Sequence, residues 1–185
     1  MAEPAIRRDV TYAEYVAFDD AAEAKHEYVR GDIFAMSGAA PEHARLPARL
    51  AELLGGPLRS RGCVVYSSDL RIRIEAVDRA AYPDLTVVCG ALETSAVDPN
   101  AATNPTVIVE VRSDSTELYD RSDKWADYQR VSSLRHYVLV SQDRRRVEVY
   151  SRTDLGWHYA DVREHGTVSL SAVDVAFALD ALYAR

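Results

Sequence analysis

The segment VIVEV, residues 107–111, constrains the fold more than any other stretch of the chain. Val107, Ile108, Val109 and Val111 form an apolar run of the kind that fills a strand buried inside a sheet. Glu110 interrupts this run. A buried ionised carboxylate without a partner is strongly destabilising, so such a group is normally paired, protonated or bound to a metal. The segment therefore predicts a buried strand and a partner for Glu110.

The first third of the chain predicts two helices with a hairpin between them. Thr11-Tyr12-Ala13-Glu14 has the spacing of a capping box that opens a helix. HEYVRGDIFAM, residues 26–36, predicts a hairpin that turns around residues 30–32. A longer helix is expected from about Pro41, with one apolar side made of Leu46, Leu50, Leu53 and Leu54. Pro47 either kinks this helix or marks its true start, and Gly55-Gly56-Pro57 is expected to end it.

The remainder of the chain is predicted to form mainly strands. CVVYS, LRIRIE and PDLTVVCG precede a polar loop over 91–105, and a helix is expected from about Leu118 to Gln129. HYVLVS, RVEVYS and GWHYADV then predict a meander. Helices followed by a mixed sheet with one crossover helix predict an α/β or α+β fold, in a single domain over 1–185.

Composition limits the classes of function. The chain is 48% hydrophobic and 28% charged, which is typical of a globular protein. It contains neither an apolar stretch of about 20 residues, as a membrane span needs, nor a secretory signal, so we expect a cytoplasmic protein. The net charge of −7 argues against broad, charge-driven binding to nucleic acid, but it allows an enzyme whose acidic residues hold a metal. Cys63 and Cys89 fit no zinc motif and are expected to be reduced core residues.

Two carboxylates stand on neighbouring candidate strands. Asp84 lies at the mouth of the apolar strand LTVVC, and Glu110 lies inside the next one. If the strands are neighbours, the two carboxylates can meet and bind a hard cation such as Mg²⁺ or Mn²⁺. The alternative is that Asp84 caps a turn while Glu110 points to solvent from a half-exposed strand.

The helix expected after Glu110 carries a cation on one face. Asp120, Lys124 and Tyr128 follow one another at steps of four residues, so they share a helical face. One interpretation is a solvated Asp120–Lys124 ion pair beside a packed tyrosine. The other is that this face turns back toward the Glu110 strand and supplies a positive charge. Spacing alone leaves both open.

An ordered set of segments resembles a known family. HEYVRGDIFAMSGAAPEH, SSDLRIRI, YPDLTVVC, VIVEVRSDST and DRSDKWADY resemble the Uma-type family of restriction endonuclease-like proteins, within the PD-(D/E)XK nuclease superfamily. The resemblance runs from about Tyr12 to Tyr150. It implies a restriction endonuclease-like core, in which a central mixed β-sheet is flanked by helices.

The resemblance also implies roles for individual residues. Asp84 and Glu110 fall on the two acidic metal-binding positions, and Glu27 on an acidic residue that often completes the metal site. The lysine that usually follows the second acid by two residues is replaced by Arg112, and the lysine role is taken over by Lys124. The expected catalytic residues are thus Asp84, Glu110 and Lys124, with Asp120 and Arg112 in support and Mg²⁺ or Mn²⁺ as cofactor. Arg112, Asp114 and Pro47 depart from the family pattern.

The preferred hypothesis is metal-dependent hydrolysis of phosphodiester bonds in nucleic acid, with DNA as the expected substrate by analogy. The alternatives are a non-catalytic module that keeps the fold and binds nucleic acid or a protein, and a structural homodimer. Arg71 and Arg73, and the turn of Arg144, Arg145 and Arg146, could contact phosphates or simply face solvent. His26, His43 and Asp69 are expected to be structural.

Overall fold

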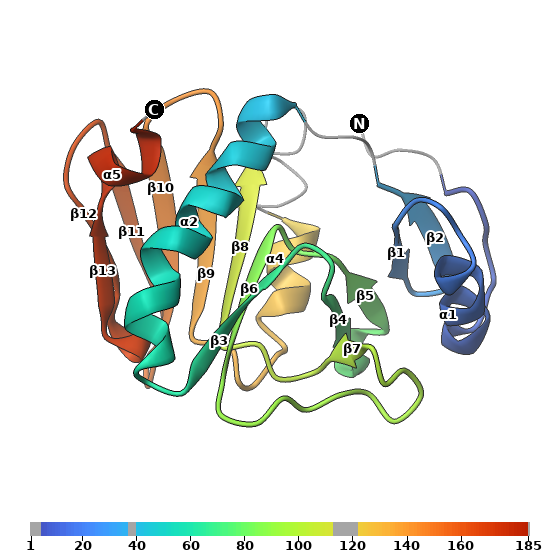
Figure 1. The fold of residues 1–185 in the computed structure, drawn as a ribbon. Helices are drawn as coiled ribbons and strands as arrows, with labels where there is room; N and C mark the ends of the chain where they lie inside the picture. Colours follow the sequence, from blue (N-terminus) through green and yellow to red (C-terminus); the bar gives the residue numbers. More distant parts are fainter. Residues whose placement is uncertain (1–4, 37–39, 113–121, 185) are drawn as a thin grey trace.

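The largest sheet runs through the middle of the molecule (Figure 1). The computed structural model describes residues 5–36, 40–112 and 122–184. Within them, six strands pair in the order β11-β10-β9-β8-β6-β3. Their bounds are β3 (Cys63–Ser67), β6 (Leu85–Cys89), β8 (Val107–Arg112), β9 (His136–Ser141), β10 (Arg146–Thr153) and β11 (Gly156–Arg163). β8 and β9 are parallel, whereas the other neighbours are antiparallel. The predicted mixed sheet and the β9–β11 meander are confirmed.

The Glu110 strand, β8, is buried on both faces of this sheet. Val107, Val109 and Val111 pack into one apolar cluster, and Ile108 packs into the other. The long helix α2 (Pro41–Arg59) covers the first face, and the short helix α4 (Asp123–Tyr128) covers the second through Tyr128. A central sheet flanked by helices is therefore confirmed, and it explains the nearly unbroken apolar run.

Helix α2 is longer than the sequence predicts. It begins at Pro41, so Pro47 does not mark its start, and it continues through Gly55, Gly56 and Pro57 to Arg59. The expected break at Gly55-Gly56-Pro57 is wrong. The buried face recurs every four residues and extends past the break, at Leu46, Leu50, Leu54 and Leu58. Packing of this face outweighs the low helix propensity of glycine and proline.

A second sheet carries the N-terminal layer. Its five strands pair in the order β2-β1-β5-β4-β7, with bounds β1 (His26–Val29), β2 (Asp32–Ala35), β4 (Arg71–Ile74), β5 (Arg79–Ala81) and β7 (Ala101–Ala102). The β1–β2 hairpin is confirmed, with positive φ angles at Arg30 and Gly31 as a tight primed turn requires. Strand β7 lies in the stretch predicted as loop. The capping box of α1 (Tyr12–Asp20) is present as predicted.

The C-terminal elements were not predicted from the sequence. A two-stranded sheet of β12 (Thr167–Leu170) and β13 (Val175–Ala178) precedes α5 (Leu179–Tyr183). Val168, Phe177 and Leu182 complete the apolar cluster beneath α2. None of the described helices is long and apolar enough to cross a membrane.

The two cysteines form a disulfide, contrary to the expectation that they are reduced. Cys63 and Cys89 face each other across the β3–β6 pair, with their Cα atoms 4.0 Å apart. The error has a simple cause. Each cysteine lies beside valines in an apolar strand, and only the register of the two strands reveals that the thiols are directly opposite.

Candidate active site

Asp84 and Glu110 lie at opposed positions of neighbouring strands. The β6–β8 register pairs Leu85 with Val109, so a one-residue extension sets Asp84 across from Glu110. Directly opposed residues of an antiparallel pair have Cβ atoms about 4.5–5.5 Å apart. The Oδ2 atom of Asp84 accepts a hydrogen bond of 2.6 Å from the backbone amide of Val111. The predicted adjacency of the two strands is confirmed, while a shared metal ion stays a prediction.

Glu110 has the partners that its burial demands. Its side chain is 6% exposed, and its Oε1 atom lies 3.0 Å from the Nζ atom of Lys124. The hydroxyl of Tyr128, one turn further along α4, donates a hydrogen bond of 2.9 Å to the same oxygen. Burial and the charge of Glu110 raise the pKa of Tyr128 well above its usual value, so the tyrosine stays a donor. The alternative of a solvent-facing Glu110 is wrong.

Lys124 is buried between two carboxylates. Its Nζ atom lies 2.9 Å from Oε1 of Glu27, on β1, as well as 3.0 Å from Glu110. Burial acts to raise the pKa of Glu27, but Lys124 and Arg79 together hold it below its usual value. A solvated lysine on an exposed helix face is therefore not what is observed. Asp120, its predicted partner, lies outside the described residues.

Arg79 and Asp127 extend this cluster, and neither was predicted from the sequence. Arg79 NH2 lies 3.5 Å from Oε2 of Glu27, and Arg79 NH1 lies 2.7 Å from Oδ2 of Asp127. Asp127 also pairs with the exposed Arg30, at 2.5 Å. Asp127 follows Lys124 by three residues, and this helical spacing was the one signal that could have revealed it. Nothing local marks Arg79, whose role depends on the pairing of β1 with β5.

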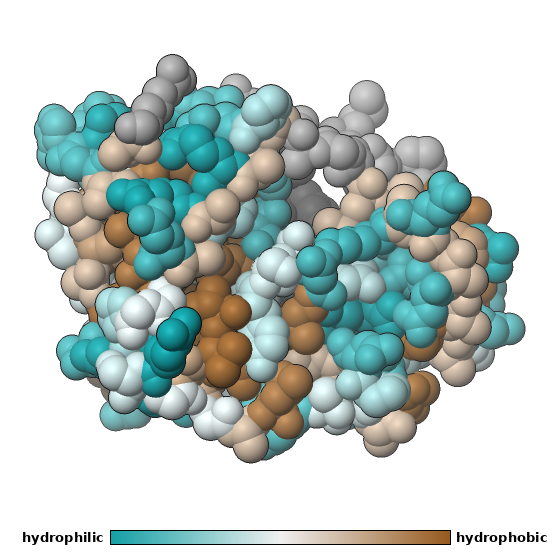
Figure 2. Space-filling view, viewed as in Figure 1, coloured by the Kyte–Doolittle hydropathy of each residue, from teal (hydrophilic) through white to brown (hydrophobic). Residues whose placement is uncertain are grey.

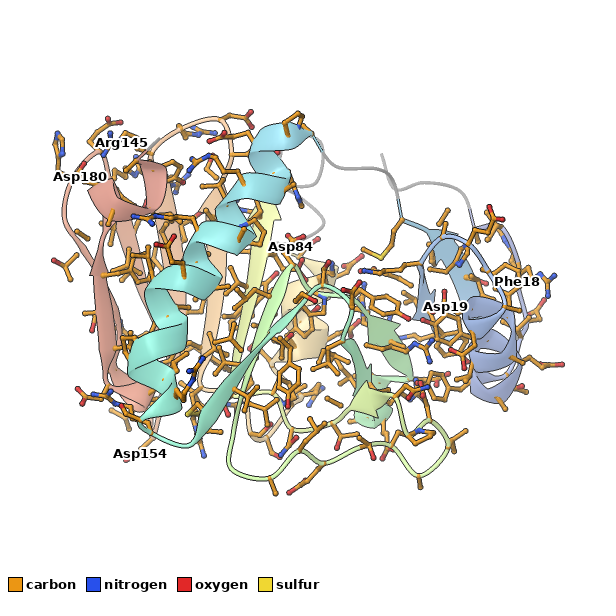
Figure 3. All side chains as sticks on the ribbon, viewed as in Figure 1. Phe18, Asp19, Asp84, Arg145, Asp154 and Asp180 are labelled. Carbon is orange, nitrogen blue, oxygen red and sulfur yellow. A yellow bond between two sulfur atoms is a disulfide. The ribbon has the colours of Figure 1, made fainter. Side chains whose placement is uncertain are left out.

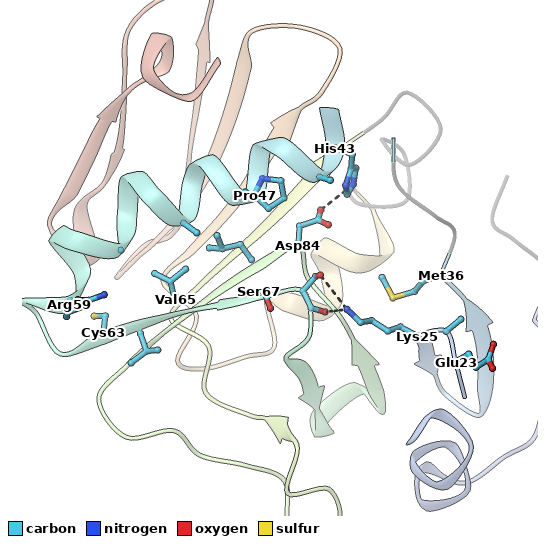
Figure 4. Close-up of a pocket in the computed structure, with 18 residues that line it drawn as sticks. Glu23, Lys25, Met36, His43, Pro47, Arg59, Cys63, Val65, Ser67 and Asp84 are labelled. Carbon is cyan, nitrogen blue, oxygen red and sulfur yellow. Dashed lines mark hydrogen bonds and ion pairs between the residues drawn. The ribbon is translucent and has the colours of Figure 1, made fainter. Parts of the chain in front are cut away.

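Asp84 opens onto a groove between α2 and the N-terminal layer. The groove has a volume of about 1090 Å³, and its lining includes Lys25, His43, Val65, Ser67 and Asp84. The ring of His43 lies 3.6 Å from Asp84, and Lys25 donates hydrogen bonds to Ser68 (Figure 4). Lys25 also pairs with Asp69, at 2.5 Å. Figure 2 shows hydrophobic surface beside α2 on this face. The groove gives solutes a route to Asp84, while Glu110 lies deeper.

The other predicted cations lie in ion pairs. Arg112 contacts the buried Glu148, which joins β8 to β10. Arg71 is held by Asp19, Asp20 and Asp98, and Arg73 by Asp78. Arg145 pairs with Asp180, close by at the same end of the molecule (Figure 3), and Arg146 with Asp161. These arginines act within the fold, and none of these contacts brings Arg112 to the carboxylates of Asp84 and Glu110.

The remaining predicted structural residues have ordinary partners. The Nδ1 atom of His26 lies 3.0 Å from Asp19, and Asp69 binds Lys25. Both contacts agree with the structural roles expected of His26 and Asp69.

The donor set fits a hard divalent cation at Asp84 and Glu110. Both side chains offer carboxylate oxygens from opposed positions, and Mg²⁺ binds proteins through one or two carboxylates while keeping several waters. Among residues 5–36, 40–112 and 122–184, no group of three His, Cys, Asp or Glu side chains could hold a metal. Glu27 binds the cations Lys124 and Arg79, and its role as a third metal ligand stays a prediction.

The fold matches that of a solved protein. A crystal structure described as "a putative nuclease belonging to DUF820", from Anabaena variabilis, superposes with a TM-score of 0.73. The match covers 94% of this chain and 98% of that chain, at 14% sequence identity. At this identity the likeness concerns the fold alone, and it agrees with the central mixed sheet flanked by helices expected from the sequence.

Sequence comparisons identify the family. A family model described as "Putative restriction endonuclease" (Uma2) matches residues 12–181. The uncharacterized protein slr1290 of Synechocystis is 32% identical over 171 residues, which cover 92% of this chain and 89% of that protein. A second Synechocystis protein, sll1609, is 32% identical over 149 residues, 80% of this chain and 84% of that protein. The chain belongs to the Uma2 family, and the resemblance noted in the sequence is confirmed.

Proposed function

We propose that the chain is a metal-dependent endonuclease that hydrolyses phosphodiester bonds in nucleic acid, with DNA as the substrate by analogy with its family. One observation carries the proposal. The Lys124 ammonium lies 3.0 Å from Glu110, on the strand position opposed to Asp84. Asp84 lines a groove at the same end of the strand pair, which supports the proposal that the two acids and the lysine act together.

Each residue has a distinct role in this proposal. Asp84 and Glu110 would hold the metal, which would supply a water of lowered pKa and polarise the phosphate. Lys124 offsets the negative charge that builds on the phosphoryl oxygens, or orients the attacking water. Tyr128 fixes the carboxylate of Glu110 by its hydrogen bond. The contacts of Glu27 with Lys124 and Arg79 favour a role in holding Lys124. These contacts do not test its predicted role as a metal ligand.

The route of the substrate follows from the groove. Asp84 lines the groove, whereas Glu110 is buried, so the scissile phosphate would approach from the Asp84 side. A volume of about 1090 Å³ is that of a small-ligand pocket, so we expect a phosphate and its neighbouring nucleotides, and not a whole duplex, to enter the groove. The negative net charge predicts weak binding to nucleic acid away from this site.

The test compares cleavage by matched variants. Purified protein is incubated with supercoiled plasmid and with labelled oligonucleotides, in millimolar Mg²⁺, Mn²⁺ or chelator. We expect metal-dependent cleavage that Asp84→Asn and Glu110→Gln each abolish. Asp180→Asn, a surface carboxylate that pairs with Arg145, serves as the control and should cleave normally. Cleavage that survives Asp84→Asn would reject the site. Binding of DNA without cleavage would favour the non-catalytic module.

Two further expectations remain predictions. The cytoplasmic location and a homodimer rest on the sequence alone. The Cys63–Cys89 disulfide argues against the cytoplasmic location, because disulfides are rare in the reducing cytosol.

A further inference from the structure

We propose that Arg79 is a positioning residue for Lys124, which it sets in place by binding Glu27 and Asp127 at the same time. The proposal rests on the proposed function, since it assigns Arg79 to the support of that site. In this role Arg79 contacts neither substrate nor metal.

The geometry places Arg79 within a chain of alternating charges that leads to Lys124. Its side chain is fully buried, with 0% exposure. One nitrogen of the guanidinium, NH2, faces Glu27 on β1, and the other, NH1, faces Asp127 on α4. The guanidinium fork is planar and rigid, so it fixes the relative placement of two carboxylates in a way that a point charge cannot.

Both carboxylates held by Arg79 control Lys124. Glu27 gives one oxygen to Lys124, at 2.9 Å, and the other to Arg79, at 3.5 Å. Asp127 lies on α4 only three residues after Lys124, so its bond to Arg79 ties the helix that carries the lysine to strand β5. Arg79 thereby fixes both the carboxylate that Lys124 binds and the backbone from which Lys124 extends.

Loss of the arginine fork should therefore displace the ammonium from Glu110. Without Arg79, Glu27 can turn both oxygens toward Lys124 and draw it away from Oε1 of Glu110. Arg30 also binds Asp127, but its side chain is 56% exposed and it has no described contact with Glu27, so it cannot replace the fork. A displacement of about 1 Å at a catalytic group can lower a rate by about 100-fold.

The first arm of the experiment compares two buried arginines. Arg79→Lys keeps the charge but removes the fork. The control, Arg71→Lys, makes the same change at another buried arginine that binds carboxylates, Asp19 and Asp98, in a network that does not include Lys124. For folded variants we expect a loss of kcat of about 10- to 100-fold in Arg79→Lys with KM nearly unchanged. Arg71→Lys should keep the kcat of the parent.

The second arm follows Lys124 directly and does not require activity. The chain has only two lysines, Lys25 and Lys124. Protein labelled with ¹³C at the lysine Cε carbon therefore gives two side-chain signals in an NMR spectrum, which a Lys25→Arg variant assigns. Arg79→Lys and Arg71→Lys each add a third lysine signal, so a Lys124→Arg version of each variant assigns the Lys124 signal. We expect that signal to shift or broaden in Arg79→Lys and to stay in place in Arg71→Lys.

The outcomes separate this inference from the proposed function. A parent that never cleaves rejects the endonuclease, and the NMR arm then decides the positioning role alone. An unmoved Lys124 signal in folded Arg79→Lys, or an unchanged kcat where the parent cleaves, overturns the inference. If Arg79→Lys does not fold, Asp127→Asn replaces it, because that change removes the anchor of α4 and keeps the shape of the side chain. The same shift in the Lys124 signal is expected, and its absence has the same meaning.

Discussion

Two buried ion networks differ in the cation at their centre. In one, Arg71 binds Asp19, Asp20 and Asp98 at 2.9, 2.8 and 2.5 Å and donates its Nε hydrogen to Tyr82. In the other, the ammonium of Lys124 lies between Glu27 and Glu110. The first network ties α1 to β4, and the second ties α4 to the end of β8, where Asp84 reaches the groove.

We propose that the choice of cation reflects a difference between a structural network and a catalytic one. Of the 22 lysines and arginines in the chain, only two are lysines. A lysine at position 124 is therefore unusual in a chain that otherwise uses arginine. An arginine fork locks two carboxylates in a fixed geometry, whereas an ammonium is a compact charge that can change partners without rebuilding its surroundings. We infer that the Arg71 network contributes mainly to stability and the Lys124 network mainly to the reaction.

The largest expected effect is on stability at Arg71. Arg71→Met would leave Asp19 and Asp98 buried without their cation, which should lower the free energy of unfolding by about 3 to 5 kcal/mol. Urea denaturation measures the change. A loss below about 1 kcal/mol would mean that the network contributes little, and the contrast with Lys124 would disappear.

The Cys63–Cys89 disulfide lies outside both ion networks and can be removed separately. It joins residues 26 apart in sequence, so its reduction should lower the free energy of unfolding by about 2 to 4 kcal/mol. Denaturation with and without reductant measures this, with a Cys63→Ala, Cys89→Ala variant as the control that reductant should not affect. Two free thiols in the untreated protein would contradict the bridge and restore the first expectation of reduced cysteines.

Removing Lys124 should cost less stability than removing Arg71. In Lys124→Met, Glu27 still has a cation, Arg79, and Glu110 keeps the hydroxyl of Tyr128. In Arg71→Met, Asp19 and Asp98 both lose their arginine. We expect a loss of about 1 to 3 kcal/mol in the free energy of unfolding, measured beside Arg71→Met under the same conditions. A loss equal to or larger than that of Arg71→Met would make Lys124 a structural residue as well.

At neutral pH the smallest effect is that of His136, whose contribution to the free energy of unfolding changes only in acid. Burial lowers the pKa of His136 to about 4, and its Nε2 atom accepts a hydrogen bond from the amide of Ala172. Its folded pKa lies below the unfolded value of about 6.5. Its contribution is therefore complete above about pH 6.5 and is lost as the pH falls toward 4.

The pH dependence of unfolding tests this histidine. Between pH 6.5 and 4, the free energy of unfolding should fall by at most about 1.4 kcal/mol per pH unit from this group. His136→Gln should remove that part of the slope. An unchanged slope in the variant would assign acid sensitivity to the carboxylates of the two networks.

The sequence allowed prediction of the sheet and of half of the site. VIVEV and LTVVC are apolar runs whose burial is local information, and the steps of four from Asp120 to Tyr128 correctly grouped Lys124 with Tyr128 on one helical face. The disulfide and Arg79 could not be predicted in this way, because both depend on strand register, which joins residues distant in sequence. The continuation of α2 through Gly55 and Gly56 was missed for a related reason, since the burial of Leu58 outweighs local propensity.

The central claim is that Lys124 supports a metal-dependent reaction at Asp84 and Glu110. The most direct measurement is the rate of plasmid cleavage in Mn²⁺ or Mg²⁺ by the parent, Lys124→Ala and Lys124→Arg, with folding checked by circular dichroism. The account predicts that Lys124→Ala folds and loses most of the activity, and that Lys124→Arg does not fully restore it, because a planar guanidinium does not reproduce an ammonium. Unchanged turnover in folded Lys124→Ala would contradict the account and remove Lys124 from the site.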